Sequence, residues 1–131
     1  MKKTSLLHAE LSHLIATLGH GDAVVIADAG LPVPAGTRCI DLALTRGVPA
    51  FEQVLEAVLT EMQVERAGYA DEMVTHSPRL EALLHARLGH AALETVSHEA
   101  LKQRTGSARA IVRTGECTPY ANVILYAGVV F

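Results

Sequence analysis

An unbroken apolar run from Ala23 to Ala27, with three β-branched residues at its centre, constrains the fold more than any other segment. A strand with one face in water alternates apolar and polar side chains, whereas this run has no polar position. It therefore predicts a short strand that is buried on both faces, with other elements packed above and below it. Residues 28–36, with two glycines and two prolines, are predicted to form a loop.

Two segments in the first half of the chain have the spacing of an amphipathic helix. The first is predicted to begin at a cap near Thr4 or Ser5 and to end at Gly19. Its apolar stripe comprises Leu7, Leu11, Leu14, Ile15 and Leu18. The second is predicted to begin at Pro49, because proline is favoured at the first helical position. Its apolar stripe comprises Phe51, Val54, Leu55, Val58, Leu59 and Met62.

Two further helices are predicted in the second half of the chain. One begins at Ser77-Pro78 and ends at Gly89, and the other covers residues 98–104 with Ser97 as its cap. Strands are predicted at residues 38–42, 64–69, 93–96, 108–113 and 123–130. Helices and strands that alternate in this way are typical of an α/β fold. We predict one domain, residues 1–131, built as a three-layer α/β/α sandwich with a mostly parallel or mixed sheet.

The composition argues against several classes of protein. Half of the residues are hydrophobic and the mean hydropathy is +0.26, yet no stretch reaches the roughly 18 apolar residues of a membrane span. We therefore expect a large subunit interface and no membrane partner. The net charge is −3 and the basic residues are scattered, which argues against nucleic acid as a partner. Two cysteines make no disulfide framework, and no signal sequence is recognised, so a cytoplasmic protein is predicted.

The turn Gly19-His20-Gly21 contains the first candidate for chemistry. Histidine changes its charge near neutral pH more readily than other side chains, so it suits proton transfer. The glycines on both sides leave the imidazole of His20 unscreened. The alternative is a histidine that simply lies in a surface turn.

Asp28 and His98 are candidates because of where the predicted elements place them. Asp28 follows the buried strand, and ligand crevices in α/β sheets lie beyond the carboxyl ends of strands. The alternative for Asp28 is a turn formed by its own side chain. His98 lies in the first turn of a helix, whose dipole favours the neutral imidazole, and Lys102 on the same helical face would add to this effect. A neutral imidazole can accept a proton or bind a hydroxyl; the alternative is an exposed polar residue.

Tyr120 and Asn122 lie two residues apart at the end of the loop from Thr114 to Asn122, with Ala121 between them. A phenol and a carboxamide provide donors and acceptors that suit neighbouring hydroxyl groups of a ligand. The alternative is a capped turn between two strands.

No metal or cofactor is predicted. The seven histidines form no HExxH motif and none is paired with cysteine at metal-ligand spacing. There is no Walker loop and no GxGxxG motif after a strand, so phosphate and dinucleotide sites are not expected.

Several of these residues belong to motifs that resemble the ribose pyranase and fucose mutarotase family, in the same order along the whole chain. The motifs are Leu18-Gly19-His20-Gly21-Asp22, Ile26 to Pro34, Ile40 to Leu44, Gly47 to Phe51, Arg113 to Glu116 and Pro119-Tyr120-Ala121-Asn122. Residues 28–32 resemble the ribose branch, whereas Gly21 is typical of the fucose branch.

The resemblance implies an isomerase that interconverts the pyranose and furanose forms of D-ribose by acid–base ring opening and closure. It implies a proton-donor role for His20 and substrate contacts for Asp28, His98 and Tyr120-Ala121-Asn122. Lys102 is a possible supporting residue only because of its position on the helical face of His98. It also implies a decameric ring of identical subunits. The alternatives are an L-fucose-type mutarotase that exchanges anomers, a non-catalytic sugar-binding module and a metal-dependent hydrolase.

The predicted strand length adds a geometric constraint. His20 precedes the strand and Asp28 follows it, so their Cα atoms would lie about 20–25 Å apart at about 3.3 Å per residue. They can hardly both touch one small sugar within one subunit. Either one of them lies outside the site, or His20 comes from a neighbouring chain, and the apolar surplus favours the shared site.

Overall fold

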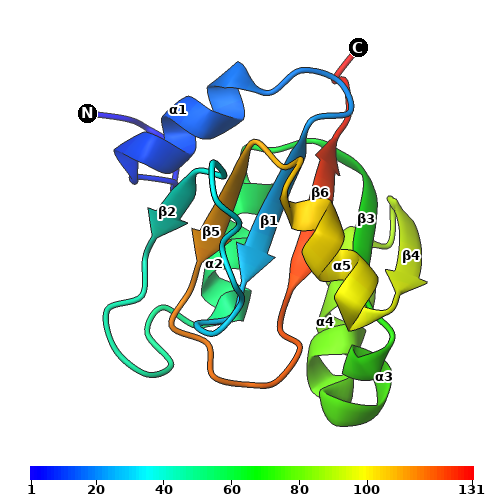
Figure 1. Cartoon of the computed structure of the whole chain (residues 1–131). Coiled ribbons are helices and arrows are strands. Elements are labelled where there is room, and N and C mark those ends of the chain that lie inside the picture. Colours follow the sequence, from blue (N-terminus) through cyan, green and yellow to red (C-terminus); the bar gives the residue numbers. More distant parts are fainter.

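The apolar run forms β1 (Ala23–Ala27), which lies in the interior of a six-stranded sheet. The computed structural model describes residues 1–131. The order of strands across the sheet is β2-β5-β1-β6-β3-β4 (Figure 1). The other strands are β2 (Cys39–Asp41), β3 (Val64–Ala70), β4 (Ala92–Val96), β5 (Ala110–Arg113) and β6 (Val123–Ala127).

The sheet is mixed, because one of its strands runs against the others. β1 and β2 are both parallel to β5, and β3 is parallel to β4. β6 lies between β1 and β3 and is antiparallel to both. The connection between β5 and β6, residues 114–122, holds no helix. A parallel return needs a crossover connection of a dozen or more residues, usually a helix, so this short loop brings β6 back in the opposite direction.

Helices lie on both faces of the sheet, which confirms the predicted α/β class (Figure 1). Val24 and Ile26 of β1 belong to a core cluster with the helices of one face, whereas Val25 and Ala27 belong to a second cluster with Leu101 on the other. β1 is therefore buried on both faces, as the sequence predicts. The helices are α1 (Ala9–Thr17), α2 (Phe51–Leu59), α3 (Glu72–His76) and α4 (Pro78–Leu88) on the first face and α5 (His98–Thr105) on the second.

The predicted start of the first helix is wrong. α1 begins at Ala9, and its cap is His8, whose Nδ1 accepts a hydrogen bond from the backbone N–H of Leu11 over 3.3 Å. Leu7 therefore lies outside the helix and is 69% exposed, while Leu6 takes its place in the core. Because His8 is not one of the usual capping residues, the sequence pattern pointed to Thr4 or Ser5 instead.

Two smaller differences concern α2 and α3. Pro49 precedes the N-cap residue Ala50, so it lies just before α2 rather than inside its first turn. The five-residue helix α3 is not predicted at all, since it is too short to show helical periodicity. The predicted ends of α4 and the capping of α5 by Ser97, which accepts from the N–H of Ala100, are confirmed.

No helix of the structure is both long enough and apolar enough to cross a membrane.

Gly115 fixes the packing of the loop after β5 against the turn before α2. Its backbone O accepts from the N–H of Gly47 over 2.6 Å, and its own N–H donates to the O of Pro49 over 2.9 Å. A Cβ at this position would lie 2.5 Å from the backbone O of Thr45, a distance that no side-chain rearrangement can relieve.

We expect Gly115→Ala to lower the free energy of unfolding by about 1–3 kcal/mol, since the added methyl group forces two backbone segments apart. Urea unfolding followed by circular dichroism measures the loss. Gly106→Ala is the matched control, because a Cβ there would lie 3.7 Å from its nearest neighbour, an ordinary contact. Equal stability of the two variants would contradict the assigned role of Gly115.

Candidate active site

A reciprocal pair of hydrogen bonds ties the carboxyl end of β1 to the loop before β6. The backbone N–H of Asp28 donates to Oδ1 of Asn122 over 2.9 Å, and Nδ2 of Asn122 donates to Oδ2 of Asp28 over 2.8 Å. Asn122 is fully buried, so its amide depends on these partners. The second carboxylate oxygen of Asp28 accepts from the N–H of Gly30 over 2.9 Å. Asp28 thus forms a turn and also presents a fixed carboxylate at the end of the strand.

A hollow of about 370 Å³ opens beside this carboxylate. Its volume lies within the range of small-molecule sites. It lies where β1 and β5 end, which is where ligands of α/β sheets bind. The lining residues are Asp28, Ala29, Gly30, Glu116, Cys117 and Pro119.

Glu116, which is not among the predicted site residues, holds this loop in place. Its Oε1 accepts from the N–H of Phe51 over 3.1 Å, and its Oε2 accepts from the hydroxyl of Thr118 over 3.0 Å. Phe51 is the first residue of α2, so the carboxylate caps the positive end of that helix. The backbone O of Glu116 accepts from the N–H of Ala29 over 2.8 Å, which joins the two loops that line the hollow.

Asp41 and Arg113 join β2 to β5 next to the same loop. The guanidinium binds the carboxylate through both Nε, over 3.1 Å, and Nη2. These hydrogen bonds from Arg113 hold the pKa of the Asp41 carboxyl below its usual range. The pair therefore stays charged at neutral pH and fixes the point at which the loop leaves β5.

Tyr120 occupies a conformation that only a few non-glycine residues adopt, with a φ of 62°. Its backbone O accepts from the N–H of Asn122 over 2.8 Å, and the buried Ser77 donates its hydroxyl to the O of Pro119 over 2.6 Å. The ring of Tyr120 packs near two imidazoles, those of His76 and His98, with 5.1 Å between ring centroids in each case. His76 comes from α3, so the sequence carried no signal for its place here.

His98 is held at the start of α5, as predicted. Its backbone N–H donates to the carboxylate of Glu72 over 3.0 and 3.2 Å. Its Nδ1 is buried and has no hydrogen-bond partner. Lys102 lies one turn further on, but its ammonium binds Glu99 over 2.5 Å. The structure therefore gives Lys102 no contact with the imidazole of His98.

Ala121 is fully buried and packs in the larger core cluster. The single chain therefore leaves no surface of Ala121 open to a ligand.

His20 lies at the other end of the sheet. Its turn precedes the amino end of β1 and is bound to the carboxyl end of β6, because the N–H of Gly21 donates to the O of Ala127 over 2.8 Å. Asp28 follows the carboxyl end of β1. The structure thus brings Asp28, His98, Tyr120 and Asn122 together and leaves His20 apart from them within one chain, as the strand length predicts.

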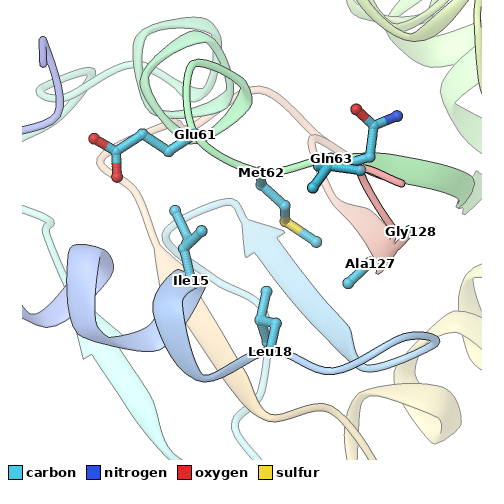
Figure 2. A pocket seen from close by; sticks show the side chains of 8 residues that line it. Ile15, Leu18, Glu61, Met62, Gln63, Ala127 and Gly128 are labelled. Carbon is cyan, nitrogen blue, oxygen red and sulfur yellow. The ribbon is translucent and has the colours of Figure 1, made fainter.

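Two other hollows contain none of the predicted site residues. One of about 150 Å³ lies between the end of α1, the residues that precede β3 and the end of β6, and five of its eight lining residues are hydrophobic (Figure 2). The other, of about 390 Å³, is an apolar groove between the N-terminal segment and α2. No group of three or more His, Cys, Asp or Glu side chains is placed to hold a metal ion.

Comparison with known proteins gives consistent matches over the whole chain. The model of the RbsD / FucU transport protein family matches residues 1–130. D-ribose pyranase of Variovorax paradoxus is 59% identical, with 100% of both chains covered. The structure of Bacillus subtilis RbsD complexed with D-ribose has a TM-score of 0.97 and 45% identity, again over 100% of both chains. The fucose mutarotase of Streptococcus pneumoniae, in complex with L-fucose, shares the fold with a TM-score of 0.82 at 24% identity and full coverage of both chains.

The pair of Asp28 and Asn122 generates a stability prediction. Asn122→Asp keeps the shape of the side chain but replaces the donating Nδ2 with an oxygen that faces the Asp28 carboxylate. We expect the free energy of unfolding at neutral pH to fall by about 1–3 kcal/mol, because a buried donor is lost and two carboxylates are opposed. Urea unfolding measures this change.

The double variant D28N/N122D is the control for this prediction. It restores one amide and one carboxylate with the two roles exchanged, and the N–H of residue 28 keeps an acceptor. We expect it to recover most of the lost stability. A double variant as unstable as Asn122→Asp alone would show that another contact of Asn122 matters more.

Proposed function

Because the chain belongs to the RbsD / FucU transport protein family, we propose that it has D-ribose pyranase activity and interconverts the pyranose and furanose forms of D-ribose. The observation that carries this proposal is the 59% identity to a D-ribose pyranase over the full length of both chains. The sugar follows from the same comparison: identity to the structure with D-ribose is 45%, against 24% to the structure with L-fucose.

The reaction needs acid–base chemistry. The pyranose and furanose rings interconvert through the open-chain aldehyde, so a base must take the proton of the anomeric hydroxyl while an acid protonates the ring oxygen. Closure by a different hydroxyl then gives the other ring. One C–O bond to the anomeric carbon breaks and another forms, protons are transferred, and no oxidation state changes overall, so neither an electron sink nor a metal ion is required.

We assign the binding of the sugar to the cluster at the carboxyl end of β1. The carboxylate of Asp28 and the phenol of Tyr120 provide hydrogen bonds to hydroxyl groups. Asn122 holds Asp28 and thereby contributes to binding, and the buried Ala121 supports the loop between Tyr120 and Asn122. Lys102 makes no contact with His98 and acts on that imidazole only at a distance, through its positive charge.

The role of His98 follows from its buried Nδ1. A buried N–H without an acceptor is rarer in proteins than a buried acceptor without a donor, which favours a proton on Nε2. His98 then donates a hydrogen bond through Nε2 and has no accessible nitrogen with which to take a proton. This supports a water molecule, rather than His98, as the base that accepts the anomeric proton.

We assign the acid to His20 of a neighbouring subunit. Asp28 and His20 lie at opposite ends of β1, so the binding cluster of one chain cannot be reached by its own His20. A ring of identical subunits, decameric as the family resemblance implies, would place the His20 turn of one copy against the cluster of the next. Oligomerisation is then part of the catalytic mechanism.

We propose a cytoplasmic location from the state of the two cysteines. Cys39 and Cys117 are both free and exposed thiols, which suits a reducing compartment.

Saturation-transfer NMR on D-ribose tests both the proposed activity and the proposed role of His20 as the acid. We expect the protein to accelerate exchange between the pyranose and furanose signals, and His20→Ala to reduce this acceleration by about 10²–10⁴-fold, the usual contribution of one positioned proton-transfer group. No acceleration by the unmodified protein would favour a sugar-binding module. Acceleration that fully survives His20→Ala would remove His20 from the mechanism.

Mixing of subunits tests the shared site. His20→Ala and His98→Ala subunits, each inactive alone, are unfolded together in equal amounts and refolded. If each site takes His20 from one chain and His98 from the next, about a quarter of the sites in a random ring contain both residues, and activity returns. A site within one chain predicts no recovery, because every site then keeps one defect.

A further inference from the structure

The imidazole of His20 has one hydrogen-bond partner in the chain, the carboxylate of Glu65. The proposed ring-opening mechanism gives this carboxylate no role. Nε2 of His20 lies 2.8 Å from Oε2 of Glu65, which contacts no other polar side chain. The two side chains are 62% and 44% exposed. Ion pairs this exposed contribute little to stability, so stability does not account for the pair.

Hydrogen bonds hold the backbone of the His20 turn in place without any contribution from the His20 side chain. The N–H of Gly19 donates to Oδ2 of Asp22 over 2.8 Å, which closes the turn. The N–H of Gly21 and the O of Asp22 both bind the backbone of Ala127 in β6. What remains free in this turn is the rotation of the His20 side chain.

Glu65 owes its place to an irregularity in β3. Val64 is paired with Ala127 and Arg66 with Tyr126, so Glu65 is an extra residue between two adjacent positions of β6. Such bulges bend a strand and redirect a side chain, and they are frequent beside active sites. Without the extra residue, the carboxylate could not be directed toward the turn of His20 in the same way.

The end of β6 leaves room for this bulge. A Cβ on Gly128 would lie 3.0 Å from the Cβ of Glu65, tighter than ordinary contacts, and the N–H of Gly128 donates to the O of Gln63 over 2.9 Å. Gln63 and Gly128 lie side by side where β3 begins, and Glu61 projects away from them on the far side of the hollow (Figure 2).

We propose that Glu65 is a positioning residue, which holds the ring of His20 and keeps a proton on Nε2, so that Nδ1 exchanges protons with the sugar. This inference rests on the proposed role of His20. An ionised carboxylate only accepts hydrogen bonds, so the ring nitrogen that faces it carries the hydrogen. Nδ1 is then a donor in the charged imidazole and an acceptor in the neutral one.

The proton balance follows from this assignment. Nδ1 of the charged imidazole gives its proton to the ring oxygen as the bond from that oxygen to the anomeric carbon breaks. The anomeric hydroxyl gives its proton to the water, and the aldehyde forms. When another hydroxyl attacks the aldehyde, its proton returns to Nδ1 and the carbonyl oxygen takes the proton from the water. Nε2 keeps its hydrogen bond to Glu65 throughout.

Glu65→Gln is the first test, since it keeps the length of the side chain but replaces the carboxylate with an amide that can donate to Nε2. We expect kcat for ribose exchange to fall about 10–100-fold, as for other residues that orient a functional imidazole, with KM changed less than about twofold. Glu61→Gln is the matched control. Glu61 is near Glu65 in the sequence and pairs with Lys2 over 3.1 Å, and its loss should leave exchange unchanged.

The second measurement is the position of the proton on the neutral imidazole of His20. If Glu65 had a purely structural role, its replacement would not change this position. Imidazole ¹⁵N NMR, with the His20 signals identified by their loss in His20→Ala, reports which nitrogen of the neutral ring is protonated. We expect the Nε2–H form in the unmodified protein and in Glu65→Asp, which keeps the carboxylate and part of the activity. Glu65→Gln should increase the Nδ1–H form.

The double variant H20A/E65Q separates this inference from the proposed function. If Glu65 acts through His20, the double variant exchanges ribose at the rate of His20→Ala alone. A further loss, or a Glu65→Gln protein with unchanged kcat and an unchanged proton position, would overturn the role of Glu65. If His20→Ala itself is fully active, the assignment of the acid fails instead.

Discussion

The length of β1, a strand buried on both faces, is the constraint on which the rest of the structure depends. Because neighbours cover it on every side, the strand cannot bend to bring its ends together, and it separates the His20 turn from Asp28. The proposed acid, His20, therefore cannot meet the proposed binding cluster of its own chain. In the proposed mechanism a second copy completes each site, so the subunit interface is a chemical requirement and not only a gain in stability.

The elements that could be predicted from the sequence are those specified by local signals. The apolar run of β1, the cap Ser97 and the ending of α4 at Gly89 each depend on residues a few positions apart, and all are confirmed. The start of α1 was missed because His8 replaces a usual cap. The mixed order of the sheet and the place of β6 depend on contacts between distant segments, which periodicity does not report.

In the candidate site, too, local sequence signals predict some residues, whereas contacts between distant segments determine the others. The sequence predicts Asp28 and Asn122 as site residues independently, each from its position at the end of an element, yet their reciprocal hydrogen bonds join residues 94 positions apart. Glu116, which caps α2 from a distance, and His76, on a helix too short to predict, could not be found in this way. Nor could Glu65, because a bulge in β3 directs its carboxylate to His20.

The two ends of β1 differ in how firmly their side chains are held, and the proposed shared site accounts for this difference. At the binding end, the strained backbone of Tyr120 costs about 1–3 kcal/mol, and buried partners such as Ser77 and Asn122 hold it in place. Hydrogen bonds to several hydroxyls need such fixed geometry. At the acid end, the side chain of His20 is mostly exposed. An acid that works across a subunit boundary must project from its own chain, and a single carboxylate beside it can set its orientation without covering it.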